Sequence, residues 1–227
     1  MKIAVLGTGV VGRAHAAKLA ELDHEVFMGT QDIEKTLART KPDEMGNQPF
    51  NVWHKENSKV KLATFVDAAK HGEIIFEAIK GEMAVEVLKT LEKHLNNKIL
   101  IDISNPLDFS KGMPPSLFIC NTDSLGEQIQ YALPKVKVVK TLNTMNAYLQ
   151  VDPQQLANGD HHIFVSGNDL ESKKEVTKIL KEWYGWKHVI DLGDITTSRG
   201  AEMFLPIWVR LWVALKNPMF NLKIVTE

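Results

Sequence analysis

A glycine-rich turn between a predicted strand and a predicted helix constrains this chain more than any other feature. Residues 1–6 have the composition of a buried strand, and apolar residues continue with helical spacing from position 16 to 22. Between them stands the motif G-x-G-x-x-G, which in this context predicts a dinucleotide site, although a ligand-free glycine turn is the alternative. Its three glycines suit a tight turn, a close approach to a pyrophosphate, and close helix packing. The motif comprises Gly7, Thr8, Gly9, Val10, Val11 and Gly12.

The end of the predicted second strand, residues 24–29, favours NADP(H) over NAD(H). Sites for NAD place an acidic residue there to bind the ribose 2′-hydroxyl. Here Thr30 and Gln31 follow the strand, and the first acid is Asp32. We expect the Thr30 hydroxyl and the Gln31 amide to donate hydrogen bonds to a 2′-phosphate. Lys35 and Arg39 either add charge to this subsite or form a solvated helix face.

Strand-like runs alternate with helix-like runs, which is typical of a parallel α/β sheet. We predict a Rossmann-type, doubly wound, mainly parallel sheet in a single domain, 1–227, with 198–227 as a short C-terminal helical extension. The polar stretch 40–57 carries no predicted element. Further strands are expected at 61–65, 73–79, 98–103, 136–142, 161–166 and 188–192, and helices at 81–95, 124–133 and 169–183, with a loop at 104–116.

Composition excludes several classes of protein. The formal net charge is −1, so the chain lacks the basic footprint of a nucleic-acid-binding protein. Its single cysteine, Cys120, excludes an internal disulfide, and its apolar neighbours predict a buried side chain rather than a nucleophile. The first strand begins at once, leaving no room for a signal peptide, and the apolar stretch 203–215 is too short to span a bilayer. We expect a cytoplasmic protein with no membrane partner.

Several motifs together resemble the F420-dependent NADP reductase family, and the chain is also similar to the oxidoreductase domain of the STEAP metalloreductases. The resemblance spans nearly the whole chain. Where the family has Gly-Ser/Thr-Arg after the second strand, this sequence has Gln31 in place of the arginine. The matching segments are the glycine motif and residues 29–32, 102–106, 139–145, 167–169 and 191–194.

The resemblance implies hydride transfer between a nicotinamide and a flavin-like ring. That ring would be deazaflavin F420 in the first relative and an ordinary flavin, FMN or FAD, in the second. Such chemistry belongs to the two cofactors and needs no catalytic triad or metal. The sequence offers no such cluster, and we assign no metal site. His161 and His162 are adjacent on a predicted strand, so they face opposite ways and do not easily share one ion.

Three further loops lie at the carboxyl ends of predicted strands, where open α/β sheets bind ligands. The first is expected to border the ribose and pyrophosphate and the second the nicotinamide, although each could be a plain turn. The third has polar groups suited to the edge of a flavin-like ring, which makes it the predicted hydride-acceptor pocket. These loops contain Ala78, Ile79 and Lys80, then Ser104, Asn105 and Pro106, then Asn143, Thr144, Met145 and Asn146.

The apolar residues of the C-terminal helix are expected in the core or in a homodimer contact, and one or two could line the acceptor pocket. Arg199 precedes this helix and either binds an acidic tail of the acceptor or pairs with Glu202 or Asp194. Two other functions stay open. One is a sensor that binds NADP(H) without turnover. The other is a reductase of a small imine or carbonyl, although such reductases carry a longer helical domain.

Overall fold

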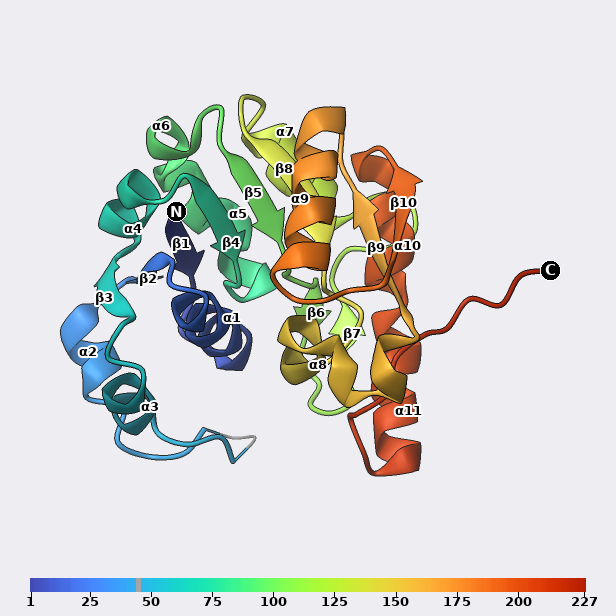
Figure 1. The fold of residues 1–227 in the computed structure, drawn as a ribbon, viewed down its shortest axis with the longest axis horizontal. Coiled ribbons are helices and arrows are strands. Elements are labelled where there is room, and N and C mark those ends of the chain that lie inside the picture. Colours follow the sequence, from blue (N-terminus) through green and yellow to red (C-terminus); the bar gives the residue numbers. More distant parts are fainter. Residues whose placement is uncertain (44–45) are drawn as a thin grey trace.

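An eight-stranded sheet forms the centre of the protein. The structure, a computed structural model, describes residues 1–43 and 46–227. The sheet order is β10-β9-β8-β5-β4-β1-β2-β3 (Figure 1). Its strands are β1 (Lys2–Leu6), β2 (Glu25–Thr30), β3 (Lys61–Thr64), β4 (Ile74–Glu77), β5 (Ile99–Asp102), β8 (Lys137–Thr141), β9 (His162–Ser166) and β10 (His188–Gly193). The predicted Rossmann-type fold is confirmed.

The last two strands run against the other six. Strand β9 pairs antiparallel to β8, with Lys140 opposite Ser166, and β10 pairs parallel to β9. The other neighbours in the sheet are parallel, so six strands end at one edge. The sheet is mainly parallel, as predicted, but the reversal at β9 was not foreseen.

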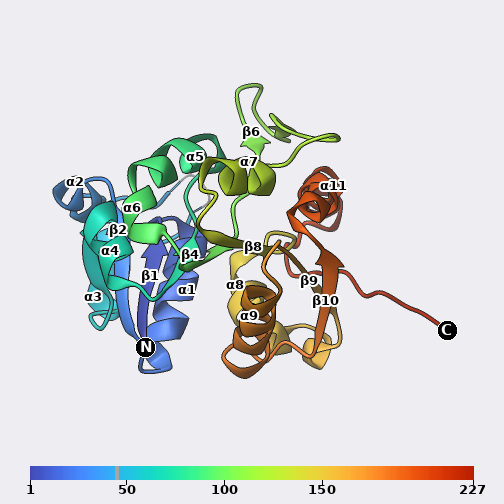
Figure 2. The same cartoon turned by 90° about the horizontal axis from the view of Figure 1, so that it is seen from above.

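Helices cover both faces of the sheet and enclose two hydrophobic cores (Figure 2). Successive side chains of β1 alternate between them: Ile3 and Val5 join one core, and Ala4 and Leu6 join the other. The first core lies under α1 (Val10–Glu21), α3 (Phe50–Glu56), α8 (Ala147–Val151) and α9 (Leu170–Glu182). The second lies under α4 (Phe65–His71), α5 (Gly81–Thr90), α6 (Glu92–Leu95) and α7 (Leu125–Ala132).

The helices between β2 and β5 differ from the prediction in three respects. The polar stretch 40–57 contains α3, which buries Phe50 and Trp53 although most of its neighbours are polar. Helix α4 starts directly after β3, where no helix was expected. The helix predicted over 81–95 is divided at Leu91, a turn residue with φ −101 and ψ −1 that separates α5 from α6. Helix α2 (Ile33–Leu37) follows β2.

An arm projects from the sheet between β5 and α7 (Figure 2). It carries a small antiparallel pair, β6 (Leu107–Asp108) and β7 (Ser116–Leu117), within the region predicted as loop. Cys120 follows β7 and is exposed, so the prediction of a buried cysteine is wrong. The apolar run around it belongs to the arm, where Ile119 packs against the second core but Phe118 and Cys120 are exposed.

The C-terminal part folds as α10 (Ser198–Met203) and α11 (Leu205–Leu215), with Pro206 in the first turn of α11. Leu205 and Val209 are buried, whereas Ile207, Val213 and Leu215 are exposed. The chain then crosses back to β9 and ends in a tail that leaves the body (Figure 1). Short 3-10 turns occur at Pro153–Gln155, Ala157–Gly159 and Ile195–Thr197. None of the helices in the described part of the chain is long and apolar enough to cross a membrane.

Candidate functional site

The glycine turn joins β1 to α1, and its three glycines meet different surroundings. Gly7 has φ +120, and a Cβ there would lie 2.3 Å from the Ala78 carbonyl oxygen. A Cβ on Gly12 would lie 2.2 Å from the Gly7 carbonyl oxygen, so α1 packs directly on the turn. A Cβ on Gly9 would meet none of the described atoms within 4 Å. The open space therefore lies above Gly9, at the start of α1, where free N–H groups favour an anion.

One cavity opens beside the glycine turn at the ends of β1, β2 and β4. It measures about 270 Å³ and contains most of the residues predicted for the adenosine end of a dinucleotide. The Thr30 side chain is buried there, and its hydroxyl lies 2.8 Å from the Thr36 hydroxyl. Arg39 reaches into the same cavity. The lining comprises Gly7, Thr8, Gly9, Gly29, Thr30, Gln31, Arg39, Phe65, Ala78, Ile79, Lys80, Met83 and Val87.

A second cavity, of about 570 Å³, shares one wall with the first, formed by residues 78–80. It lies between the start of α1, the start of α5 and the base of the projecting arm. The two cavities therefore follow one edge of the sheet, as a dinucleotide bound across the strand ends requires. The second is lined by Val11, Ala78, Ile79, Lys80, Gly81, Glu82, Ile103, Ser104, Asn105, Leu107, Asp108, Phe109 and Ser110.

Two of the predicted loops are joined by a pair of amide hydrogen bonds. Asn105 Nδ2 donates to the Asn143 carbonyl oxygen at 2.9 Å, and Asn143 Nδ2 donates to Asn105 Oδ1 at 2.9 Å. Asn143, Thr144 and Met145 are buried. Asn146 caps α8, accepting from the Leu149 N–H, and donates to the Pro218 carbonyl oxygen. The side chains of Asn143 and Asn146 are thus held by protein contacts, and none of residues 143–146 lines either of the two cavities.

A buried charge cluster lies beneath these loops, and sequence reasoning missed it. Lys140 Nζ lies 3.0 Å from Asp102 Oδ2 and 2.9 Å from Glu202 Oε1, and it donates to the Ser104 carbonyl oxygen at 2.6 Å. Burial opposes the charge of Lys140, but the two carboxylates outweigh it and raise the pKa of the lysine. Burial, followed by the charge of Asp102, raises the pKa of Glu77 well above its usual range. The cluster therefore anchors the loop that starts at Ser104.

The Glu202 carboxylate also joins α10 to α7. Its oxygens accept from the backbone N–H groups of Leu125 and Gly126 at 2.8 and 3.0 Å, at the first turn of α7. A carboxylate is favoured at that end of a helix by the backbone donors and the helix dipole. Arg199 pairs with Glu127, at Nε–Oε2 2.8 Å, and not with either of the predicted partners. Helices α7 and α10 are thus held together by two carboxylates.

A second buried network supports the loop 143–146 from the other side. His15 Nδ1 lies 2.8 Å from the Tyr184 hydroxyl, and His15 Nε2 lies 3.0 Å from Gln150 Oε1. Gln150 Nε2 donates to the carbonyl oxygen of Leu142 at 2.8 Å. Leu142 has φ +64, an unusual conformation for a branched side chain. Burial lowers the pKa of His15 to about 4, despite the hydrogen bond to Gln150, so the ring is neutral near pH 7.

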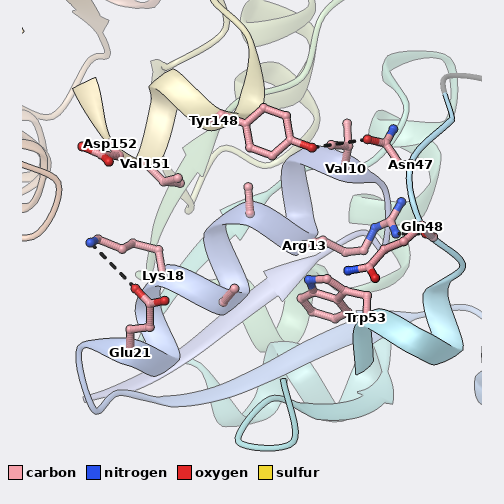
Figure 3. A pocket seen from close by; sticks show the side chains of 12 residues that line it. Val10, Arg13, Lys18, Glu21, Asn47, Gln48, Trp53, Tyr148, Val151 and Asp152 are labelled. Atoms are coloured by element: carbon pink, nitrogen blue, oxygen red, sulfur yellow. Dashed lines mark hydrogen bonds and ion pairs between the residues drawn. The ribbon is translucent and has the colours of Figure 1, made fainter. Parts of the chain in front are cut away.

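A separate groove of about 340 Å³ runs along the outer face of α1 (Figure 3). Arg13 lies in it and pairs with Asp43 at 3.2 Å while donating to the Gln48 carbonyl oxygen. Lys18 lies 3.9 Å from Glu21 across the same face. Each cation in the groove thus lies beside a carboxylate, which disfavours an anionic ligand there.

The two adjacent histidines make separate contacts. His161 is buried, and its Nε2 lies 3.0 Å from the Pro153 carbonyl oxygen. His162 stacks on His188, with ring centroids 4.8 Å apart. Across residues 1–43 and 46–227, no group of three or more histidine, cysteine, aspartate or glutamate side chains is arranged to hold a metal ion.

The sheet order, the glycine turn and the paired cavities define a Rossmann-type nucleotide-binding protein. Comparison with known proteins is more specific. The sequence profile of the family "NADP oxidoreductase, coenzyme F420-dependent" matches residues 2–106. The F420-dependent NADP reductase of Methanocaldococcus jannaschii is 31% identical over 99% of this chain and 98% of that protein. The chain belongs to the F420-dependent NADP reductase family, a family of oxidoreductases, as its motifs predicted.

Solved structures agree with this assignment. A protein of Arthrobacter sp. FB24, provisionally described as an F420-dependent NADP reductase, is 55% identical over 100% of both chains, with a TM-score of 0.93. A variant imine reductase of Myxococcus stipitatus, 15% identical, shares the fold alone, with a TM-score of 0.59. The match covers 95% of this chain but only 62% of the imine reductase chain.

Proposed function

We propose that this protein transfers hydride between NADP(H) and the deazaflavin ring of coenzyme F420. The observation that carries the proposal is the pair of cavities that share residues 78–80 along the carboxyl edge of the parallel strands. The names of the relatives support the choice of both cofactors. We further propose that the whole chain acts as one domain.

In this proposal the first cavity holds the adenosine end of the dinucleotide, beside Thr8, Thr30 and Gln31. The turn 7–12 holds the pyrophosphate, because the space above Gly9 is open and the first N–H groups of α1 face it. Residues 78–80, Ser104 and Asn105 border the second cavity, where the nicotinamide lies, whereas Pro106 does not line it. The turn and the cavity walls therefore fit a dinucleotide in an extended form.

The acceptor ring is proposed to stack on the nicotinamide beside Asn105, with the loop 143–146 behind it. The two cofactors supply the redox chemistry, and the protein holds and aligns them. Direct hydride transfer requires the reacting atoms to be about 3–3.5 Å apart. The two hydrogen bonds between Asn105 and Asn143 give the loops the rigidity that this alignment needs. FMN or FAD is the alternative acceptor.

Stopped-flow oxidation of NADPH against a set of acceptors tests the proposal. We expect rapid oxidation with F420 and little with FMN, FAD, ferric chelates or a cyclic imine. A faster reaction with a flavin, a ferric chelate or the imine would reassign the acceptor. Binding of NADPH without oxidation by any acceptor would instead favour a nucleotide sensor, the alternative that needs no second cofactor.

We also propose a homodimer through the C-terminal helix. Three large apolar side chains of α11 are exposed, namely Ile207, Val213 and Leu215, although the same helix buries Leu205 and Val209. A second copy packed against α11 would remove part of that apolar surface from water. Sedimentation equilibrium of the wild type and of Val213→Glu checks this. A wild-type monomer at micromolar concentration would contradict it.

A further inference from the structure

We propose that Arg39 is the residue that recognises the 2′-phosphate of NADP(H) in this chain. The inference rests on the proposed dinucleotide site and adds the group that distinguishes NADP(H) from NAD(H). Sites for NADP(H) use a nearby arginine to accommodate the 2′-phosphate, and the strand end itself offers only the neutral Gln31. Arg39 comes two residues after α2 and nine residues after the end of β2.

Two threonines hydrogen-bond to the Arg39 guanidinium, and one of them, Thr8, lines the first cavity with it. Its Nη1 donates to Thr8 Oγ1 at 3.0 Å, and its Nη2 donates to Thr36 Oγ1 at 3.4 Å. Thr8 belongs to the glycine turn, and Thr36 is buried and contacts Thr30 at the end of β2. The guanidinium therefore connects the glycine turn to α2 and, through Thr36, to the end of β2. The turn and that strand end enclose the adenosine ribose in a Rossmann site.

The guanidinium keeps hydrogen-bonding capacity for an anion. Arginine has five N–H donors, and the two contacts with threonine use two of them. No carboxylate lies within ion-pair distance of Arg39 in the described ranges 1–43 and 46–227. A phosphate bound there would receive charge-assisted, potentially bidentate hydrogen bonds, which neutral side chains cannot provide.

The other candidates at this end of the cavity are less suited to the phosphate. The Thr30 side chain is buried and neutral, and its hydroxyl already contacts the Thr36 hydroxyl at 2.8 Å. The Lys35 side chain is 87% exposed and lies 3.5 Å from Asp32, outside the cavity lining. Lys80 lines the shared wall between the two cavities, at the start of α5, where it faces the middle of the dinucleotide.

The test compares two small ligands that differ only in the 2′-phosphate, 2′,5′-ADP and 5′-AMP, by titration calorimetry. Arg39→Gln should weaken 2′,5′-ADP about 10- to 150-fold, the range for losing hydrogen bonds to a charged group. Binding of 5′-AMP should change less than about twofold, because that ligand lacks the phosphate. Lys35→Gln is the matched control and should leave both affinities near those of the wild type.

A variant that moves the guanidinium to another position distinguishes recognition of the 2′-phosphate by Arg39 from structural support of the glycine turn. In Gln31→Arg combined with Arg39→Gln, a guanidinium returns to the cavity from the strand end, and 2′,5′-ADP should regain most of its affinity. If Arg39→Gln weakened the affinity for both ligands equally, and the double variant did not restore it, Arg39 would only hold the turn through Thr8. Unchanged affinities would also overturn the inference. A wild type that binds neither ligand would instead overturn the proposed dinucleotide site, and F420 activity does not enter the test.

Discussion

At the residue scale, Gly9 is the informative position of the turn, because a Cβ on Gly7 or Gly12 would collide with backbone atoms whereas one on Gly9 would not. We predict that Gly9→Val abolishes NADPH binding while the protein stays folded. A Cβ at this position meets no described protein atom within 4 Å, so the valine side chain enters the space proposed for the pyrophosphate without a collision at its Cβ. Calorimetry measures the binding, and circular dichroism checks the fold. Gly12→Ala is the contrasting variant, because its Cβ would lie 2.2 Å from a backbone oxygen and should destabilise the fold. Unchanged NADPH affinity in Gly9→Val would contradict the site.

His15 gives a pH dependence whose sign follows from its burial. The unfolded histidine takes up a proton near pH 6.5, whereas in the folded protein burial lowers the pKa of His15 to about 4. As the pH falls from 6.5 to 4, the unfolded state gains protons that the folded state does not, so stability is lost over that range. We predict that His15→Gln has a smaller free energy of unfolding than the wild type at pH 7. The difference between the two proteins should decrease by at most about 3 kcal/mol as the pH is lowered to 4. Urea unfolding at several pH values measures this, and parallel curves would contradict it.

At the element scale, the loops after β5 and β8 should act as one unit. We predict that Asn105→Ala and Asn143→Ala each lower kcat at least tenfold with F420 and change the NADPH dissociation constant less than threefold. The reason is that the paired amides position the proposed acceptor face, whereas the dinucleotide is held mainly at the turn. The double variant should be no slower than Asn105→Ala, because that substitution already removes both hydrogen bonds and Asn143→Ala removes only one of them. Additive losses would mean that the two asparagines act separately.

The strands could be predicted where the residues next to one another in the sequence are enough to indicate them. Strands β1, β2 and β5 are apolar runs next to turn residues, and the sequence alone placed them. The antiparallel direction of β9 could not be predicted from the residues of the strand, because it depends on how the strand packs against β8. The charge cluster had a usable signal that was missed. Glu77, Asp102 and Lys140 each stand near the end of a strand, and the register places them side by side. The contact between Asn105 and Asn143, 38 residues apart, could only come from the structure.

At the scale of the whole molecule, the sheet brings sites together that are distant in the sequence. Six parallel strands end at one edge, so the turn at residue 7, Arg39, residues 78–80 and the loop at 104 line two adjoining cavities. The sequence indicated this edge, since ligands of open α/β sheets bind there. It could not show that Arg39 turns into the cavity, because helix periodicity equally allowed a solvated side chain. The buried state of residues 143–145 likewise depends on packing against α8 and the core.

Ligand binding should therefore stabilise the whole fold and not one loop. A ligand at 100 times its dissociation constant stabilises the folded state by about 2.7 kcal/mol. For a chain of 227 residues, each kcal/mol raises Tm by roughly 2–4 °C. We predict that NADPH at that level raises Tm by about 5–11 °C. NADH at the same concentration should raise it less, because it lacks the phosphate that Arg39 is proposed to bind. Differential scanning calorimetry measures both shifts, and in Gly9→Val both should vanish. Equal shifts with NADPH and NADH in the wild type would show that the 2′-phosphate is not recognised.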